Sequence, residues 1–180
     1  MIQSSSVASA IAAFRARDRD GAVGQLWKAL DSVSGSGDHY LSIVDLAREL
    51  GEVEIALRAA DRARDTNPSD LQLRLKYWHV LSRYNREDEV QRDLQTSSAA
   101  QRNNPAVAEV RATLAMERGD FDEAMKLARW LTANGPFPER GWFWLSTMKR
   151  FERDDPDIAL MEHFISGARR DDPHARSMKD

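Results

Sequence analysis

One stretch decides how this chain folds: Gly119-Asp-Phe-Asp-Glu-Ala-Met-Lys-Leu-Ala-Arg-Trp-Leu-Thr-Ala-Asn-Gly-Pro136. A similar stretch lies upstream, Gly51-Glu-Val-Glu-Ile-Ala-Leu-Arg-Ala-Ala-Asp-Arg-Ala-Arg-Asp-Thr-Asn-Pro68. The leading glycines, the alanines Ala56 and Ala124, and the closing prolines are each separated by 68 positions. A helical hairpin that repeats needs a turn glycine, a small residue where its helices cross closely, and a proline after its second helix. The shared offset therefore predicts repeated helical hairpins.

This spacing resembles that of a tetratricopeptide (TPR) array, since 68 positions are two periods of about 34 residues. Apolar residues recur at helical spacing along the chain, which predicts hairpins at about 5–34, 38–68, 69–104, 105–136 and 139–170. Residues 171–180 then form an incomplete cap or the start of a further helix. The resemblance implies an all-α fold, a TPR-like right-handed superhelix of about four to five helix pairs, with 1–180 as a single domain.

Local signals predict where individual helices begin and end. Asp38 is expected to cap the first helix of the second hairpin. Asn85 stands in for glycine at the turn of the third, and Pro105 opens the fourth. In the last hairpin, the first helix is expected to run from Gly141 to Phe151, and Asp155-Pro156 to cap the next. The middle repeat is longer than its neighbour, since Pro68 and Pro105 are 37 positions apart and Pro105 and Pro136 are 31.

Composition narrows the class of protein. The 180 residues are 42% hydrophobic and 31% charged, enough to bury a substantial core. A formal net charge of -3 argues against a nucleic-acid-binding surface, which is normally basic. The chain has no cysteine, so disulfides and thiol chemistry are excluded. It also lacks a basic N-terminal region before an apolar run, and no stretch approaches the ~20 apolar residues of a membrane span. We therefore expect a cytoplasmic protein with neither a membrane nor a nucleic acid as partner.

The sequence offers no constellation typical of an active site. Four histidines, His39, His79, His163 and His174, lie on different repeats without the close ligand spacing of a metal site. We therefore expect no catalytic residue, no metal and no cofactor, and a chain that is not an enzyme.

A second resemblance is confined to the last hairpin. It rests on Trp142-x-Trp144-Leu145-x-x-Met148-Lys149-Arg150-Phe151-x-x-Asp154-Asp155-Pro156-Asp157-Ile158-Ala159-x-Met161-Glu162. This segment of about twenty residues is similar to the final repeat that precedes the catalytic domain in bacterial TPR-sulfotransferase proteins. In that family the sulfuryl-donor site lies on a downstream α/β domain with a strand, a phosphate-binding loop and a helix. The sequence has no such unit, so the resemblance does not make this chain the catalyst.

The TPR resemblance also implies where a partner would bind. TPR arrays bind along a concave groove lined by the first helix of each repeat. Aligned on the turns, the groove positions of this chain are Leu41, Asp45, Arg48, Leu75, His79, Arg83, Glu109, Thr113, Met116, Trp144, Met148 and Phe151. TPR proteins that grip the acidic C-terminus of heat-shock chaperones use lysines and asparagines at set positions. Here Leu41, Asp45 and Lys76 offer one match, which disfavours that clamp.

Three hypotheses for function follow. The first is a non-catalytic protein-interaction scaffold that holds a peptide or a partner's helix in the concave groove. The alternative is the N-terminal TPR region of a sulfotransferase-type enzyme truncated before its catalytic domain, serving substrate positioning or dimerisation. The third is self-association through the terminal hairpin, because a polar-faced cap is expected at a solenoid end and none is evident after Asp171. The same feature suggests a chain cut from a longer one.

Overall fold

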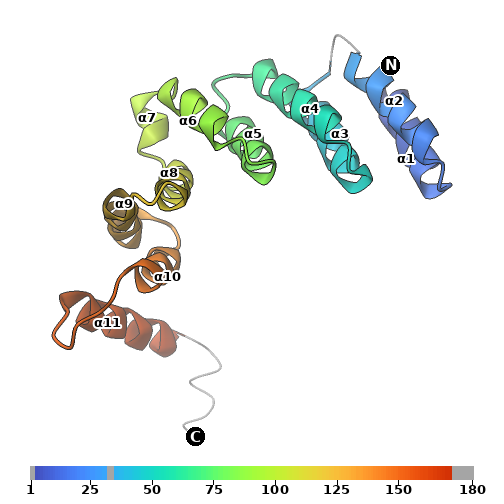
Figure 1. Cartoon of the computed structure of the whole chain (residues 1–180). Helices are drawn as coiled ribbons and strands as arrows, with labels where there is room; N and C mark the ends of the chain where they lie inside the picture. Colours follow the sequence, from blue (N-terminus) through green and yellow to red (C-terminus); the bar gives the residue numbers. More distant parts are fainter. Residues whose placement is uncertain (1–2, 32–34, 172–180) are drawn as a thin grey trace, which may run out of the picture. The chain divides into compact units, whose positions relative to one another are not determined.

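The structure, a computed structural model, describes residues 3–31 and 35–171 of the chain. The expectation for 172–180 lies outside the described residues. Within the described part, the regular elements are all α-helices, as the sequence predicts (Figure 1). They fall into two compact units, divided between Arg102 and Asn103. The single domain over 1–180 stays a prediction, as does the right-handed superhelix.

The first unit consists of seven helices among the described residues. They are α1 (Gln3–Arg15), α2 (Arg19–Asp31), α3 (Gly37–Leu50), α4 (Val53–Thr66), α5 (Leu71–Arg83), α6 (Glu87–Gln95) and α7 (Ala99–Arg102). Helices that follow one another pack together from α1 to α6, and α1 and α2 also contact α3 and α4 respectively. Figure 1 shows α3 beside α4 and α5 beside α6. This packing of adjacent pairs is consistent with a helical repeat.

Small side chains allow the helices of the first unit to approach closely. On α4, the buried face carries Ala56, Ala59, Ala60 and Ala63, which recur at three- and four-residue spacing. Larger side chains fill the space between pairs, and Leu26, Ile43 and Trp78 are fully buried among them. The alanine face therefore sets the helix separation, and the large residues provide most of the buried apolar area.

Four turns share one geometry: one at Arg17, and three that confirm the turn residues expected from the sequence. Gly51, Asn85 and Gly119 have φ angles of 76°, 54° and 74°, in the left-handed region. The residue after each donates its backbone N–H to a carbonyl five positions back, as in Glu52 to Ala47, at 2.8–3.0 Å. This bond closes the first helix of a pair and reverses the chain. Asn tolerates the left-handed region better than other non-glycine residues, which explains its use at position 85.

Two local expectations are wrong. Ser36, rather than Asp38, caps α3, since its hydroxyl accepts the backbone N–H of His39 at 3.3 Å. The helix expected to run to Phe151 ends at Met148, because Lys149 adopts an extended conformation with ψ of 131°. Phe151 therefore lies in the loop before the last helix. The extra length of the middle repeat is explained by the four-residue helix α7, which follows a short α6.

The second unit contains α8 (Pro105–Glu117), α9 (Phe121–Asn134), α10 (Pro138–Met148) and α11 (Pro156–Asp171). Helix α9 packs against both α8 and α10. Its Ala124 and Ala128 are fully buried, as expected for a close crossing. A Cβ atom on Gly141 of α10 would lie 2.7 Å from the Ala128 carbonyl oxygen, so α10 can approach α9 only with glycine there.

Candidate functional site

Two helices of the first unit enclose a hollow of about 280 Å³, which we call the α3–α5 hollow. From α3 it is lined by Leu41, Val44, Asp45 and Arg48, and from α5 by Leu75, Lys76, His79 and Val80. Five of these eight residues are groove positions expected from the sequence: Leu41, Asp45, Arg48, Leu75 and His79. Leu41 and Leu75 are 34 positions apart, as are Asp45 and His79. Two pairs of positions with the same 34-residue offset therefore face the same space.

The hollow has an apolar floor and a charged rim. Val44 and Val80 are 3% exposed and form the floor, while Leu41 and Leu75 are half-buried along the walls. Asp45, Lys76 and His79 are exposed at the rim. A concave apolar surface with a few polar groups at its edge is the usual form of a binding site on a protein. Because both walls are helices, the hollow is preformed by the fold.

Arg48 is held loosely at this rim. Its Nη1 atom lies 3.5 Å from Asp45 Oδ1, at the long limit of a hydrogen bond. Its Nε atom is buried and makes no hydrogen bond within the described part of the chain. A buried donor without a partner costs about 1–3 kcal/mol. The Arg48 side chain would therefore gain from an acceptor that the described chain does not supply.

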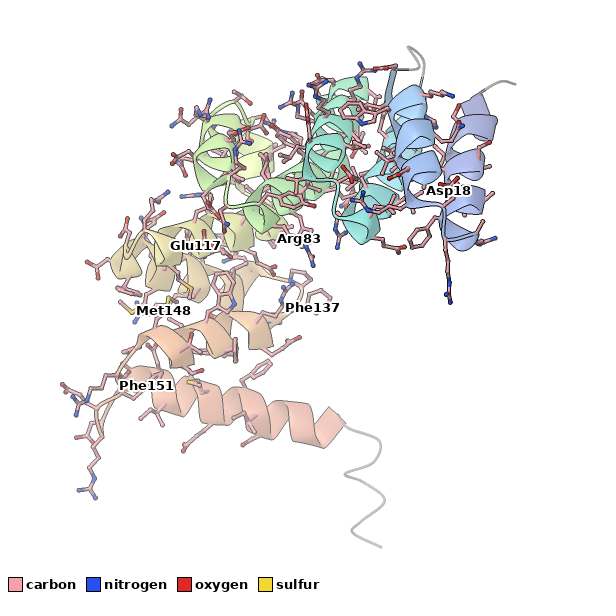
Figure 2. All side chains as sticks on the ribbon, turned by 45° about the vertical axis from the view of Figure 1, so that its right-hand side comes forward. Asp18, Arg83, Glu117, Phe137, Met148 and Phe151 are labelled. Carbon is pink, nitrogen blue, oxygen red and sulfur yellow. The ribbon has the colours of Figure 1, made fainter. Side chains whose placement is uncertain are left out.

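Basic side chains follow one face of α5 beyond the hollow. Lys76, His79 and Arg83 are spaced by three and four residues, so they lie on the same side of the helix. Arg83, labelled at the end of α5 in Figure 2, does not line the hollow but continues this face by one turn. Within residues 3–31 and 35–171, neither Lys76 nor Arg83 forms an ion pair.

The six other groove positions belong to the second unit and are absent from the α3–α5 hollow. Two of them on α8 are engaged locally: Glu109 pairs with Arg140 of α10 at 2.8 Å, and the Thr113 hydroxyl donates to the Glu109 carbonyl at 3.1 Å. Met116 is half-buried. The local contacts of Glu109 and Thr113 restrict what these two side chains could offer to a partner.

On α10 and the following loop, the remaining positions are also partly covered. Trp144 packs against the core formed by α8 and α9, and Met148 is half-buried at the end of α10. The Lys149 Nζ atom lies 5.4 Å from the centre of the Phe151 ring, a cation–π contact. Figure 2 shows Met148 and Phe151 labelled on either side of the point where the helix ends.

The structure also contains a buried polar network that the sequence did not reveal. Asp93 of α6 accepts hydrogen bonds from Arg74 at 2.9 and 3.1 Å and from the Trp78 indole N–H at 2.7 Å, while Arg64 lies 3.4 Å away. Arg74 is buried and also donates to Thr96 at 2.6 Å and to Gln101 of α7 at 3.3 Å. We call these residues the Asp93 network. Its carboxylate joins α4, α5 and α6, and Arg74 extends the network to α7.

The signal for this network in the sequence is weak. Arg74 and Trp78 are four residues apart on α5, which puts a cation on the same helix face as a core aromatic. A buried arginine needs an anion, and only the folded arrangement shows that Asp93 provides it. The network stabilises the third pair of helices.

The segment that resembles TPR-sulfotransferase proteins forms a second charged group, the Lys149 cluster. The Lys149 ammonium group donates to Asp155 and to Asp157, each at 2.7 Å, and Asp157 also accepts from Arg129 of α9 at 3.1 Å. Asp155 caps α11, as expected, by accepting the Asp157 backbone N–H at 3.0 Å. The cluster thus ties the start of α11 to α9 and to the end of α10. Several residues that carry the resemblance therefore have a structural role within this unit.

Hydrogen bonding sets the protonation behaviour of the Lys149 cluster. The bond from Lys149, supported by Arg129, holds the pKa of Asp157 below its ordinary value of 3.8. Lys149 likewise lowers the pKa of Asp155, and the two carboxylates, Asp155 first, raise the pKa of Lys149 above 10.5. All three groups are therefore charged across the physiological range of pH.

Two other kinds of site are absent from the described residues. They contain no group of three or more His, Cys, Asp or Glu side chains arranged to hold a metal ion. Nor does any helix among them have the length and apolar character needed to cross a membrane.

Comparison with known proteins adds no assignment. No protein-family model matches the chain, and neither a curated protein nor a solved structure matches it.

Proposed function

We propose that this chain is a non-catalytic protein-interaction scaffold that holds a peptide or a partner's helix in the α3–α5 hollow. The observation that carries the proposal is the convergence of equivalent positions, 34 residues apart, on one apolar space. Residues that serve only the core would be covered by their neighbours. Leu41 and Leu75 instead remain half-buried beside the hollow, where a ligand can reach them.

The size of the hollow favours side chains of a peptide over a small-molecule ligand. Sites for small ligands and cofactors typically enclose about 300–1,000 Å³ and surround most of the ligand. At about 280 Å³, the hollow lies below that range. An apolar helix face placed in a groove contributes a few anchor side chains at a time, which fits this volume. The alternative of a sulfotransferase-associated region stays a hypothesis, since the Lys149 cluster accounts for part of its motif.

The proposal is tested with a phage library that displays random twelve-residue peptides, panned against the immobilised chain. Enriched peptides are synthesised, and their affinity is measured by fluorescence anisotropy. In the variant Leu41→Gln/Leu75→Gln, polar side chains replace both apolar walls, and we expect at least a tenfold loss of affinity. Leu71→Gln is the matched control, because Leu71 is a half-buried leucine of α5 outside the hollow. Less than a twofold change is expected there.

Chemical-shift mapping with the ¹⁵N-labelled chain locates the bound peptides. The largest shifts are expected in α3 and α5. Peptides that bind the double variant as tightly as the parent, or that shift residues of α9 instead, would show that the hollow is not the site.

A further inference from the structure

The charge around the hollow differs in sign from that of the whole chain. The chain carries a formal net charge of -3. The residues that line the hollow include Arg48 and Lys76 against a single carboxylate, that of Asp45, and Arg83 lies one turn further along α5. Asp45 pairs with Arg48 at 3.5 Å and, among the described residues, forms no ion pair with Lys76 or Arg83. Lys76 at the rim and Arg83 one turn further along α5 are therefore positive charges without an ion-pair partner among the described residues.

The spacing of these charges defines what they can bind together. Lys76 and Arg83 are seven positions apart, two turns of α5, which separates them by about 10 Å along the helix axis. The apolar floor at Val80 lies between them. A helical ligand that matches this face carries carboxylates seven residues apart and apolar side chains between them, at the third and fourth positions after the first carboxylate.

We propose that the α3–α5 hollow selects an acidic amphipathic helix of a protein partner, an inference that rests on the proposed function. Its apolar side chains enter the hollow against Leu41, Leu75 and Val80. Its carboxylates pair with Lys76 and Arg83, and a further carboxylate or carbonyl draws the loosely held Arg48 into a hydrogen bond. Such charge complementarity sets which partner binds and speeds association more than it raises affinity.

The test uses three sixteen-residue peptides with an identical pair of leucines at positions i+3 and i+4. They carry glutamate, glutamine or lysine at positions i and i+7. Affinity for the full chain is measured by fluorescence anisotropy at low and at high salt. Exposed ion pairs contribute modestly, so we expect the glutamate peptide to bind about three- to tenfold more tightly than the glutamine peptide, and the lysine peptide most weakly. The difference should shrink at high salt, because both cations are exposed.

A charge swap separates this proposal from non-specific attraction. In Lys76→Glu/Arg83→Glu the order should reverse, so that the lysine peptide binds most tightly. Lys28→Glu, an exposed lysine of α2 outside the hollow, should keep the parent's order. Circular dichroism shows whether each variant is folded, which is expected because these side chains are exposed.

The outcomes also distinguish this proposal from the proposed function. Equal affinity for the three peptides, or an order that survives the charge swap, would overturn the selectivity. If none of the three binds while peptides from the random library still occupy the hollow, the acidic helix is wrong and the scaffold function stands. If library peptides also fail to bind in the hollow, both are wrong.

Discussion

Removing the carboxylate of Asp93 tests the energetic reasoning most directly. Its Oδ2 atom accepts hydrogen bonds from Arg74 and Trp78, and the Arg74 side chain is only 7% exposed. In Asp93→Ala the guanidinium group stays buried without its anion, and breaking a buried ion pair in this way costs about 3–5 kcal/mol. Arg74 keeps its bonds to the backbone carbonyl of residue 93, to Thr96 and to Gln101. We therefore expect the lower end of that range, about 3 kcal/mol.

This loss is large relative to a total stability of about 5–15 kcal/mol for a typical domain. For a chain of this size it corresponds to a fall in Tm of about 6–12 °C, at about 2–4 °C per kcal/mol. The free energy of unfolding is measured by urea titration, followed by circular dichroism at 222 nm. Glu54→Ala is the control, since Glu54 pairs with Arg58 on the surface, where both side chains are more than 60% exposed. That change should cost less than about 0.5 kcal/mol.

A double variant adds a second check. Arg74→Met/Asp93→Leu replaces both charges by apolar groups, so no buried charge is left without a partner, and it should recover much of the stability lost in Asp93→Ala. The reasoning is refuted if Asp93→Ala unfolds at the same urea concentration as Glu54→Ala.

Three further predictions concern packing, turns and protonation. Ala124→Leu should lower the free energy of unfolding by about 1–3 kcal/mol, because the fully buried site has no room for added methylenes. Ala133→Leu, on the exposed side of α9, should be nearly neutral. If the Tm of Ala124→Leu lies within a degree of the parent's, the assigned repeat register is wrong. Gly51→Ala should lower the free energy of unfolding, measured by urea titration, by about 1–2 kcal/mol, because the φ angle of Gly51 is 76°. Gly24→Ala is the control, since Gly24 lies in open space on α2. A similar loss in this control would show that backbone conformation is not the cause. Because folding lowers the pKa of Asp157, this carboxylate stabilises the fold above pH 3.8, and the stabilisation is lost as pH falls through the folded-state pKa. Because folding raises the pKa of Lys149, this ammonium group stabilises the fold below pH 10.5, and the stabilisation is lost as pH rises through its folded-state pKa. In Lys149→Gln, NMR titration of the Asp157 carboxyl should therefore give a higher pKa than in the parent, and an unchanged value would rule out Lys149 as its main partner.

The helices and their turns could be read from the sequence because the signals are local. Gly51 and Gly119 allow a left-handed turn, and Asn85 tolerates it, whatever the rest of the chain does. The 68-residue offset then relates one helix pair to another. Where the expectation failed, a contact across a loop or a competing cap decided the outcome. Lys149 leaves the helix and bonds Asp155 and Asp157, so α10 ends before Phe151.

The candidate site was only partly predictable. Position in the repeat was enough to find Leu41, Asp45, Arg48, Leu75 and His79 as neighbours of one space. The contribution of Lys76 to the rim was missed, because the expected groove positions in α5 did not include it. Expected positions in the second unit have contacts of their own, such as that between Glu109 and Arg140, which repeat position does not indicate.

The sequence by itself determined that this chain forms pairs of α-helices, where most of the turns fall, and which faces carry small residues. These follow from backbone conformation and from apolar periodicity, which act over a few residues. Only the tertiary structure decided that Asp93 neutralises Arg74 and that Lys149 ties α11 to the preceding helices. It also decided that Lys76 borders an apolar hollow without an ion-pair partner among the described residues. Charge pairing depends on distances of a few ångströms between residues far apart in the chain, and such distances are set only when the helices pack.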